Sequence, residues 1–159
     1  MVSESMAIVK YLDAYNTDGA GTSLVGTTAE ERAETDMWCG RVDEKFLFPF
    51  GVAFRCGPMA EWFKDRRPDF ILPDAAPPMV EMAQAGLAWL DSGAALGDGR
   101  PFLCGDRFTV ADMRLFTYYR FVAKIHKAQR APEALAHFHA YIERVAGRDS
   151  VAAIAPKKK

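Results

Sequence analysis

One stretch, residues 101–125, constrains the fold more than any other part of the sequence. It reads PFLCGDRFTVADMRLFTYYRFVAKI. Thr109 stands at an N-cap position and Asp112 follows three residues later, which is the pattern of a capping box. From Val110 to Ile125 apolar side chains cover most of the helix circumference, and such a helix is typical of the centre of a bundle. The sequence therefore predicts a central buried helix, and we assign Thr109 and Asp112 to capping and folding rather than to catalysis.

Hydrophobic periodicity predicts four other helices. Their expected ranges are 5–15, 28 to about 55, 76 to about 96, and 131–145, with a last turn at 150–154. Thr28 and Glu31 form a second capping-box pattern, and Pro49 predicts a kink or a break in the helix that they begin. No stretch alternates with a period of two, so no sheet is expected. The prediction is an all-α bundle of five to six helices, a single domain over residues 1–159 with a basic tail at 156–159.

Composition and charge exclude several classes of function. The net charge is −1, so there is no bulk electrostatic case for binding nucleic acid or an anionic membrane. The longest nearly apolar run, residues 46–54, is far shorter than the ~20 residues that span a bilayer. The three cysteines are widely spaced, which favours neither a metal site nor a disulfide framework. We therefore expect no metal and a reducing compartment, which is the cytoplasm.

Three segments carry more specific patterns. Residues 4–12 read ESMAIVKYL, residues 31–33 read ERA with Trp38 five positions further on, and residues 102–112 read FLCGDRFTVAD. Together they resemble the C-terminal all-α domain of the soluble glutathione S-transferases. The first resembles that family's ES-x-AI-x-x-YL segment, and the third is close to its F-L-x-G-D-x-F-(S/T)-x-A-D motif. The resemblance implies the family's helical fold and glutathione as co-substrate.

The resemblance assigns a ligand to Glu4 and Ser5. In the family this pair holds the γ-glutamyl end of glutathione. A helix N-terminus offers free N–H groups to a carboxylate, and a glutamate side chain can pair with the α-ammonium group. From the dipeptide alone, the simpler interpretation is that Ser5 is an ordinary N-cap.

The resemblance also implies an electrophile pocket lined by the first long helix and the central helix. Its candidate residues are Met37, Trp38, Arg41 and Tyr119. An apolar pocket with one or two polar groups suits a hydrophobic electrophile. The alternative interpretation is that Trp38 and Tyr119 are aromatic residues of the core.

The sequence departs from the family in one respect. Family members carry a thioredoxin-like domain before the ES segment, and that domain holds the residue that activates the glutathione thiol. This chain begins near the join, so no residue in it is assigned to thiol activation. The resemblance implies part of a glutathione-dependent transferase that conjugates hydrophobic electrophiles in detoxification and is not active alone.

A second hypothesis is a non-catalytic interaction module. Free-standing or fused helical halves of this family mediate contacts in translation elongation factors and synthetase assemblies. Under either hypothesis we expect the partner to be a second copy, such as a dimer, or a thioredoxin-like domain. Exposed apolar surface on the first and central helices would favour such contacts.

Overall fold

The computed structural model describes residues 1–15, 21–66, 71–126 and 130–153, so the predicted basic tail at 156–159 lies outside the described residues. Within these ranges the fold is all-α, as predicted. The helices are α1 (Ser5–Ala14), α2 (Ala29–Val42), α3 (Phe48–Cys56), α4 (Ala60–Phe63), α5 (Ala76–Asp91), α6 (Val110–Ile125), α7 (Ala136–Ala146) and α8 (Asp149–Ala152). A π turn, η1 (Asp43–Leu47), joins α2 to α3, and a 3₁₀ turn, η3 (Pro73–Ala75), precedes α5. The β-bridges in the described ranges are isolated pairs in the 102–107 turn.

The chain stays helical from Ala29 to Cys56, so Pro49 does not break the predicted long helix. The irregularity falls just before the proline, in the π turn η1. A π turn shifts the hydrogen-bond register by one residue. Pro49 follows in the first turn of α3, a position where a proline is tolerated because an N–H there has no regular helical partner. The capping box of Thr28 and Glu31 at the start of α2 is confirmed: the Glu31 amide donates to the Thr28 hydroxyl at 3.2 Å.

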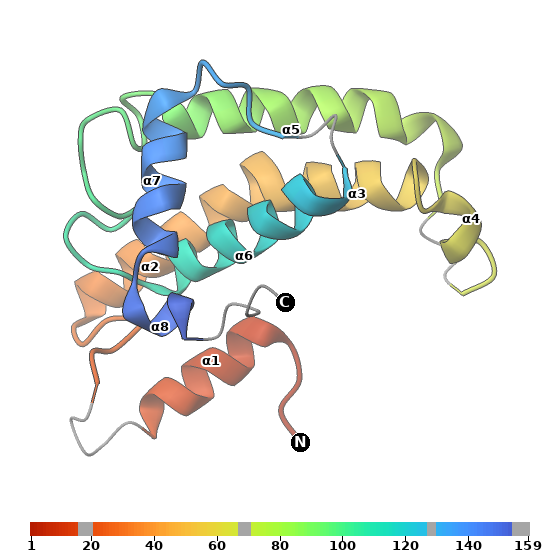
Figure 1. The fold of residues 1–159 in the computed structure, drawn as a ribbon. Helices are drawn as coiled ribbons and strands as arrows, with labels where there is room; N and C mark the ends of the chain where they lie inside the picture. Colours follow the sequence, from red (N-terminus) through yellow and green to blue (C-terminus); the bar gives the residue numbers. More distant parts are fainter. Residues whose placement is uncertain (16–20, 67–70, 127–129, 154–159) are drawn as a thin grey trace.

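Helix α6 occupies the centre, between the long α2–α3 rod and α7 (Figure 1), and the rod, α5 and α7 supply much of the remaining core. Its capping box is present as predicted. The Asp112 carboxylate accepts the Thr109 amide at 2.8 Å and the Thr109 hydroxyl at 3.1 Å. It also accepts the Leu103 amide and the Tyr141 hydroxyl, each at 2.9 Å. Burial raises the pKa of the Asp112 carboxyl, and these hydrogen bonds oppose that rise. Asp112 thus joins the turn, α6 and α7 into one unit.

Helix α5 packs against η1 and α3 at very short range. A Cβ atom at Gly86 would lie 1.8 Å from the Lys45 carbonyl oxygen, so only glycine allows this approach. The helix ends at Asp91, earlier than the predicted residue 96, because the backbone at Ser92 is extended. The Asp91 carboxylate instead accepts the Phe138 amide at 2.8 Å, in the first turn of α7. Helix α7 begins at Ala136, later than the predicted residue 131.

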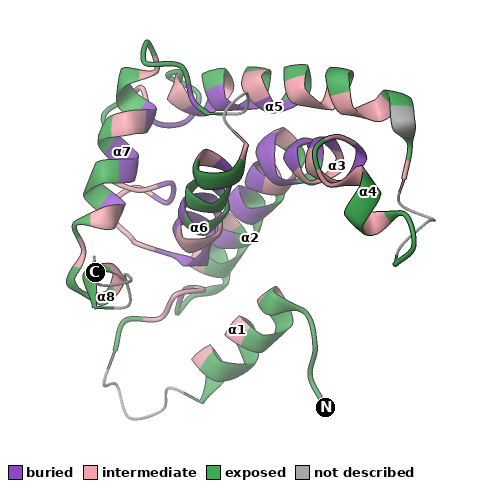
Figure 2. Cartoon of the chain, turned by 45° about the vertical axis from the view of Figure 1, so that its right-hand side comes forward, coloured by how far each residue is buried: buried purple, intermediate pink, exposed green. Residues whose placement is uncertain are grey.

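Helix α1 lies apart from the other helices and has no buried residue (Figures 1 and 2). Met6 and Val9 pack on the core from one side. The Lys10 ammonium pairs with Asp36 at 2.9 Å, and the Asp13 carboxylate accepts the Leu24 amide at 2.7 Å. No helix within the described ranges is long and apolar enough to cross a membrane.

Candidate functional site

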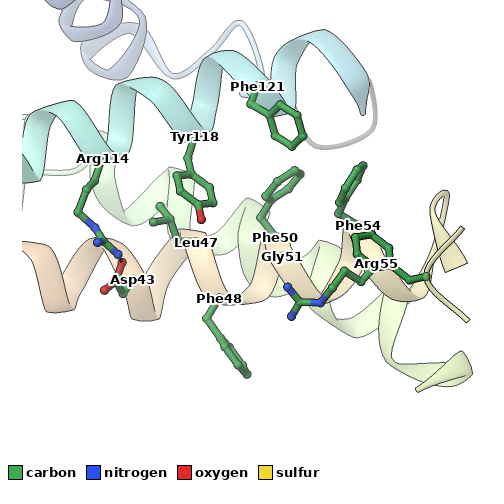
Figure 3. Close-up of a pocket in the computed structure, with 11 residues that line it drawn as sticks. Asp43, Leu47, Phe48, Phe50, Gly51, Phe54, Arg55, Arg114, Tyr118 and Phe121 are labelled. Atoms are coloured by element: carbon green, nitrogen blue, oxygen red, sulfur yellow. Dashed lines mark hydrogen bonds and ion pairs between the residues drawn. The ribbon is translucent and has the colours of Figure 1, made fainter. Parts of the chain in front are cut away.

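An aromatic pocket of about 590 Å³ opens between the α2–α3 rod and α6 (Figure 3). Phe50 and Phe54 of α3 are stacked, with ring centroids 5.9 Å apart. Phe121 of α6 turns its edge to both rings, at interplanar angles of 87° and 74°. The remaining lining residues are Asp43, Leu47, Phe48, Gly51, Arg55, Phe63, Arg114 and Tyr118. A pocket of this size and character suits a small apolar or aromatic ligand.

A second hollow, of about 220 Å³, lies between α1 and α6. Its wall on α1 begins with Ser5, the first residue of the helix. Glu4 precedes it with φ of 68°, the one positive φ among the non-glycine residues that the structure describes. This left-handed backbone turns the chain into the N-terminus of α1, and such conformations concentrate at functional sites. The Ser5 hollow therefore has the start of a helix, with Ser5 as its first residue, in one wall.

The two hollows share part of their lining, which comes from α6. Arg114 and Tyr118 line both the aromatic pocket and the Ser5 hollow. The Arg114 guanidinium forms an ion pair with Asp43 of η1. In Figure 3 the Tyr118 hydroxyl points from α6 toward the rod, beside Leu47. Arg114 and Tyr118 thus border both hollows.

The structure does not bring the four predicted electrophile-pocket residues together around either hollow. Trp38 is 2% exposed and Tyr119 is 6% exposed, and both belong to the hydrophobic core, as the alternative interpretation has it. The Tyr119 hydroxyl accepts the Ala131 amide at 3.3 Å. Arg41 lies over the Trp38 ring, with 4.8 Å to its centroid, and Met37 is exposed on α2. None of the four lines the two hollows.

Sequence reasoning missed the residues that do line the aromatic pocket. Phe50 and Phe54 line the pocket and continue a four-residue spacing that begins at Phe46, a buried residue outside the lining. This four-residue repeat is the sequence signal that could have predicted an aromatic face on the rod. Tyr118 carries no comparable signal, because its exposed position is the polar side of an otherwise apolar helix.

The lining of the two hollows includes no cysteine or histidine. Groups of acidic, histidine or cysteine side chains able to hold a metal ion are not found among the described residues. Cys39, Cys56 and Cys104 are all buried. Burial raises the pKa of the Cys39 thiol to about 11 and also raises the pKa of Cys104, which disfavours the reactive thiolate of each.

Fold and site together define a helical domain of the glutathione transferase type, and comparisons with known proteins agree. The family profile described as glutathione S-transferase, C-terminal domain, matches residues 73–144. A solved glutathione S-transferase domain-containing protein from Marinobacter aquaeolei VT8 is 31% identical, with a TM-score of 0.76 over 94% of this chain and 68% of that one. The chain therefore belongs to the glutathione S-transferase family.

Two more distant structures share the fold. Gtt2 from Saccharomyces cerevisiae is 24% identical with a TM-score of 0.77, over 96% of this chain and 68% of that one. A class Gtt2 glutathione S-transferase from Vibrio parahaemolyticus is 24% identical with a TM-score of 0.69, over 94% of this chain and 65% of that one. A search of curated proteins gives no significant match. The chain thus spans about two thirds of the length of the solved proteins that it resembles.

Proposed function

We propose that this chain supplies the γ-glutamyl end of a glutathione site and the electrophile pocket of a glutathione-dependent transferase. The observation that carries the proposal is that the two hollows share Arg114 and Tyr118 in their lining. A γ-glutamyl group at Ser5 and an apolar electrophile among Phe50, Phe54 and Phe121 would be brought together at Arg114 and Tyr118. Positioning two reactants side by side supplies much of the rate of a bimolecular reaction.

Glu4 and Ser5 suit the charged end of glutathione. The carboxylate of a γ-glutamyl group would receive hydrogen bonds from the Ser5 hydroxyl and the first free amides of α1. The Glu4 side chain is exposed and can pair with the α-ammonium group. The cytoplasm, where glutathione is abundant and thiols stay reduced, suits both this ligand and the three free cysteines.

Thiol activation is expected to come from outside the described residues. A thiolate nucleophile needs a donor or a positive charge that lowers its pKa. The family places that group in a thioredoxin-like domain, and the residues described here form no such domain. We therefore expect this chain to bind glutathione, and to catalyse conjugation only together with a thioredoxin-like partner.

Retention on glutathione-agarose, combined with a conjugation assay on a reactive aromatic halide, tests the proposal. We expect retention without turnover. Ser5→Ala should abolish retention, whereas Ser3→Ala, two residues away and also exposed, should leave it unchanged. Equal retention of both variants would contradict the assignment of Ser5, and turnover by the parent chain alone would contradict the assignment of thiol activation to a partner.

An interaction module is the second candidate function, and one observation favours it. Helix α1 and its C-cap expose four large apolar side chains at 40–67% exposure: Ile8, Tyr11, Leu12 and Tyr15. A face of this kind suits a protein partner, either a thioredoxin-like domain or a second copy. Absence of both retention and turnover would favour the module over the transferase.

A further inference from the structure

Tyr11 and Tyr15 form a pair at the C-terminal end of α1. Their ring centroids are 4.8 Å apart at an interplanar angle of 49°, and the Tyr11 hydroxyl donates to the Tyr15 hydroxyl at 3.2 Å. This hydrogen bond raises the pKa of Tyr11, which therefore stays a protonated donor at neutral pH. Among the residues that the structure describes, these are the only two tyrosines whose rings are in contact.

Both members of the pair are open to solvent. Tyr15 is the C-cap residue, its backbone is still right-handed helical, and its amide donates to the Leu12 carbonyl at 3.1 Å. The four-residue spacing therefore places the two rings next to each other on one side of the helix. Tyr11 is 48% exposed and Tyr15 is 67% exposed, so a small molecule in solution can reach both rings.

The turn that carries the pair is tied to the rest of the chain by other side chains. The Asp13 carboxylate accepts the Ser23 hydroxyl and the Leu24 amide, each at 2.7 Å. The Lys10 ammonium pairs with Asp36 of α2 at 2.9 Å. These contacts hold the end of α1 in place without using either phenol, so the two rings stay free to face each other.

The geometry of the pair is close to that of two tyrosines joined by one carbon–carbon bond. Such a biphenol links the ring carbons beside the two hydroxyls, so its rings are twisted against each other and its hydroxyls lie side by side. The rings of Tyr11 and Tyr15 are already tilted by 49°, with their hydroxyls 3.2 Å apart. Holding two reacting groups so close makes their coupling far faster than that of two free phenols.

We propose that Tyr11 and Tyr15 are a site of oxidative cross-linking, where a one-electron oxidant joins them as dityrosine. Each phenol loses one electron and one proton, and two equivalents of oxidant, such as radicals generated by a peroxidase, take up the two electrons. The two phenoxyl radicals form one carbon–carbon bond between their ortho carbons. Each of these carbons then loses its proton and each oxygen regains one, so the product has two hydrogen atoms fewer than the pair. This inference does not rest on the proposed function.

The cross-link would close a ring across one turn of α1. Because residues four apart are already neighbours on a helix, the bond requires no unwinding and prevents this turn from fraying. The amide hydrogens of residues 12–15 should therefore exchange with deuterium several-fold more slowly after oxidation than before it. Faster exchange after oxidation would show that the bond distorts the helix and would contradict the geometry.

Photo-oxidation of the full chain by a ruthenium(III) complex, at a concentration where the chain is monomeric, tests the proposal. The product is detected by the blue fluorescence of the biphenol and by mass spectrometry of a tryptic digest. Cleavage after Lys10 and Arg32 leaves both tyrosines in one peptide, residues 11–32, which contains no other tyrosine. We expect this peptide to lose two hydrogen atoms, with a yield that does not depend on the concentration of the chain.

Variants assign the product to the pair. Tyr11→Phe and Tyr15→Phe should each lower the yield by about tenfold or more, because coupling then needs a second molecule. Tyr118→Phe removes a tyrosine that is 45% exposed on α6 and should leave the yield unchanged. Tyr15→Phe combined with Leu12→Tyr is the matched control for geometry. It keeps two tyrosines on α1 but turns them about 100° apart, so it should lose the cross-link as well.

Three outcomes would overturn the inference. One is a covalent dimer in place of the intrachain product, and another is an equal yield in the control for geometry. The third is oxidation of Trp62, a competing ring that is 49% exposed, with no change in the 11–32 peptide. The result is independent of retention on glutathione-agarose, because the oxidation uses neither glutathione nor Ser5.

Discussion

Asp112 is the residue whose loss should cost the fold most. Its carboxylate is fully buried and accepts from the Leu103 and Thr109 amides and from two hydroxyls. Asp112→Ala leaves these donors buried without an acceptor, so we expect a loss of about 3 kcal/mol or more in the free energy of unfolding. Asp112→Asn keeps one acceptor oxygen but turns an NH₂ group toward donors, and should cost about 1–3 kcal/mol.

Chemical denaturation followed by circular dichroism measures both variants. Asp106→Asn, an exposed change in the preceding turn, should alter stability by less than about 0.5 kcal/mol. A cost for Asp112→Ala no larger than that of the Asp106 variant would show that the buried network does not hold the turn to α6.

Cys39 should be nearly inert in the folded protein. Its side chain is 6% exposed, and burial raises the pKa of its thiol from 9.0 to about 11. At neutral pH the thiolate is then about a hundredfold scarcer than for an unperturbed thiol, and its share rises with pH up to the folded pKa. Iodoacetamide labelling read by mass spectrometry should therefore be slow at neutral pH and accelerate in alkali. Labelling at the rate of free glutathione at neutral pH would contradict this.

At the scale of elements, the approach of α5 to the rod depends on one missing side chain. Gly86→Ala would drive a Cβ into the Lys45 carbonyl group, which is backbone and cannot rotate away. We expect a loss of about 3 kcal/mol or more in stability. Gly40→Ala in α2 is the matched control, because nothing lies within 4 Å of a Cβ there. That variant should gain about 0.5–1 kcal/mol from helix propensity, as thermal unfolding would show. Equal effects of the two changes would exclude the close approach.

Periodicity and capping predicted most of the helices and the central place of α6. Both capping boxes lie where the Thr–x–x–acid spacing puts them. The ends that were missed depend on tertiary contacts. The Asp91 carboxylate at the end of α5 accepts a hydrogen bond from the Phe138 amide, 47 residues later in the sequence. A contact between residues so far apart in the sequence leaves no local pattern that could be used to predict where α5 ends. Pro49 was expected to kink or break the rod. The chain stays helical through Pro49, and the irregularity in the rod is the π turn η1 before it.

The site was harder to predict than the fold, for a geometric reason. Neighbouring residues on a helix point about 100° apart, so Tyr119 enters the core while Tyr118 reaches the pocket. The resemblance named Tyr119 and not Tyr118, since it gave no rotation for α6, and the electrophile-pocket role of Tyr119 stays a prediction. Glu4 and Ser5 were selected by their motif, and their role in binding glutathione stays a prediction.

At the scale of the whole molecule, the exposed face of α1 leads us to expect self-association. Leu12 of α1 is 60% exposed, and Tyr15 at the C-cap of this helix is 67% exposed. Sedimentation velocity at increasing concentration should show a concentration-dependent dimer. Leu12→Lys should weaken it about tenfold or more, because a charge on a buried contact face is costly. Ala134→Lys, an exposed site in the turn before α7, should not change it. A monomer at every concentration would count against self-association.

Because α1 has no buried residue and packs on the core only through Met6 and Val9, we expect its stability to be largely separate from that of the bundle. Its amide hydrogens should exchange with deuterium far faster than those of α6, since opening α1 exposes no core side chain. Glutathione bound at Ser5 should slow exchange in α1 while leaving α6 as it was. The segment proposed to bind glutathione can therefore be loosened or replaced by mutation without unfolding the helices that line the aromatic pocket.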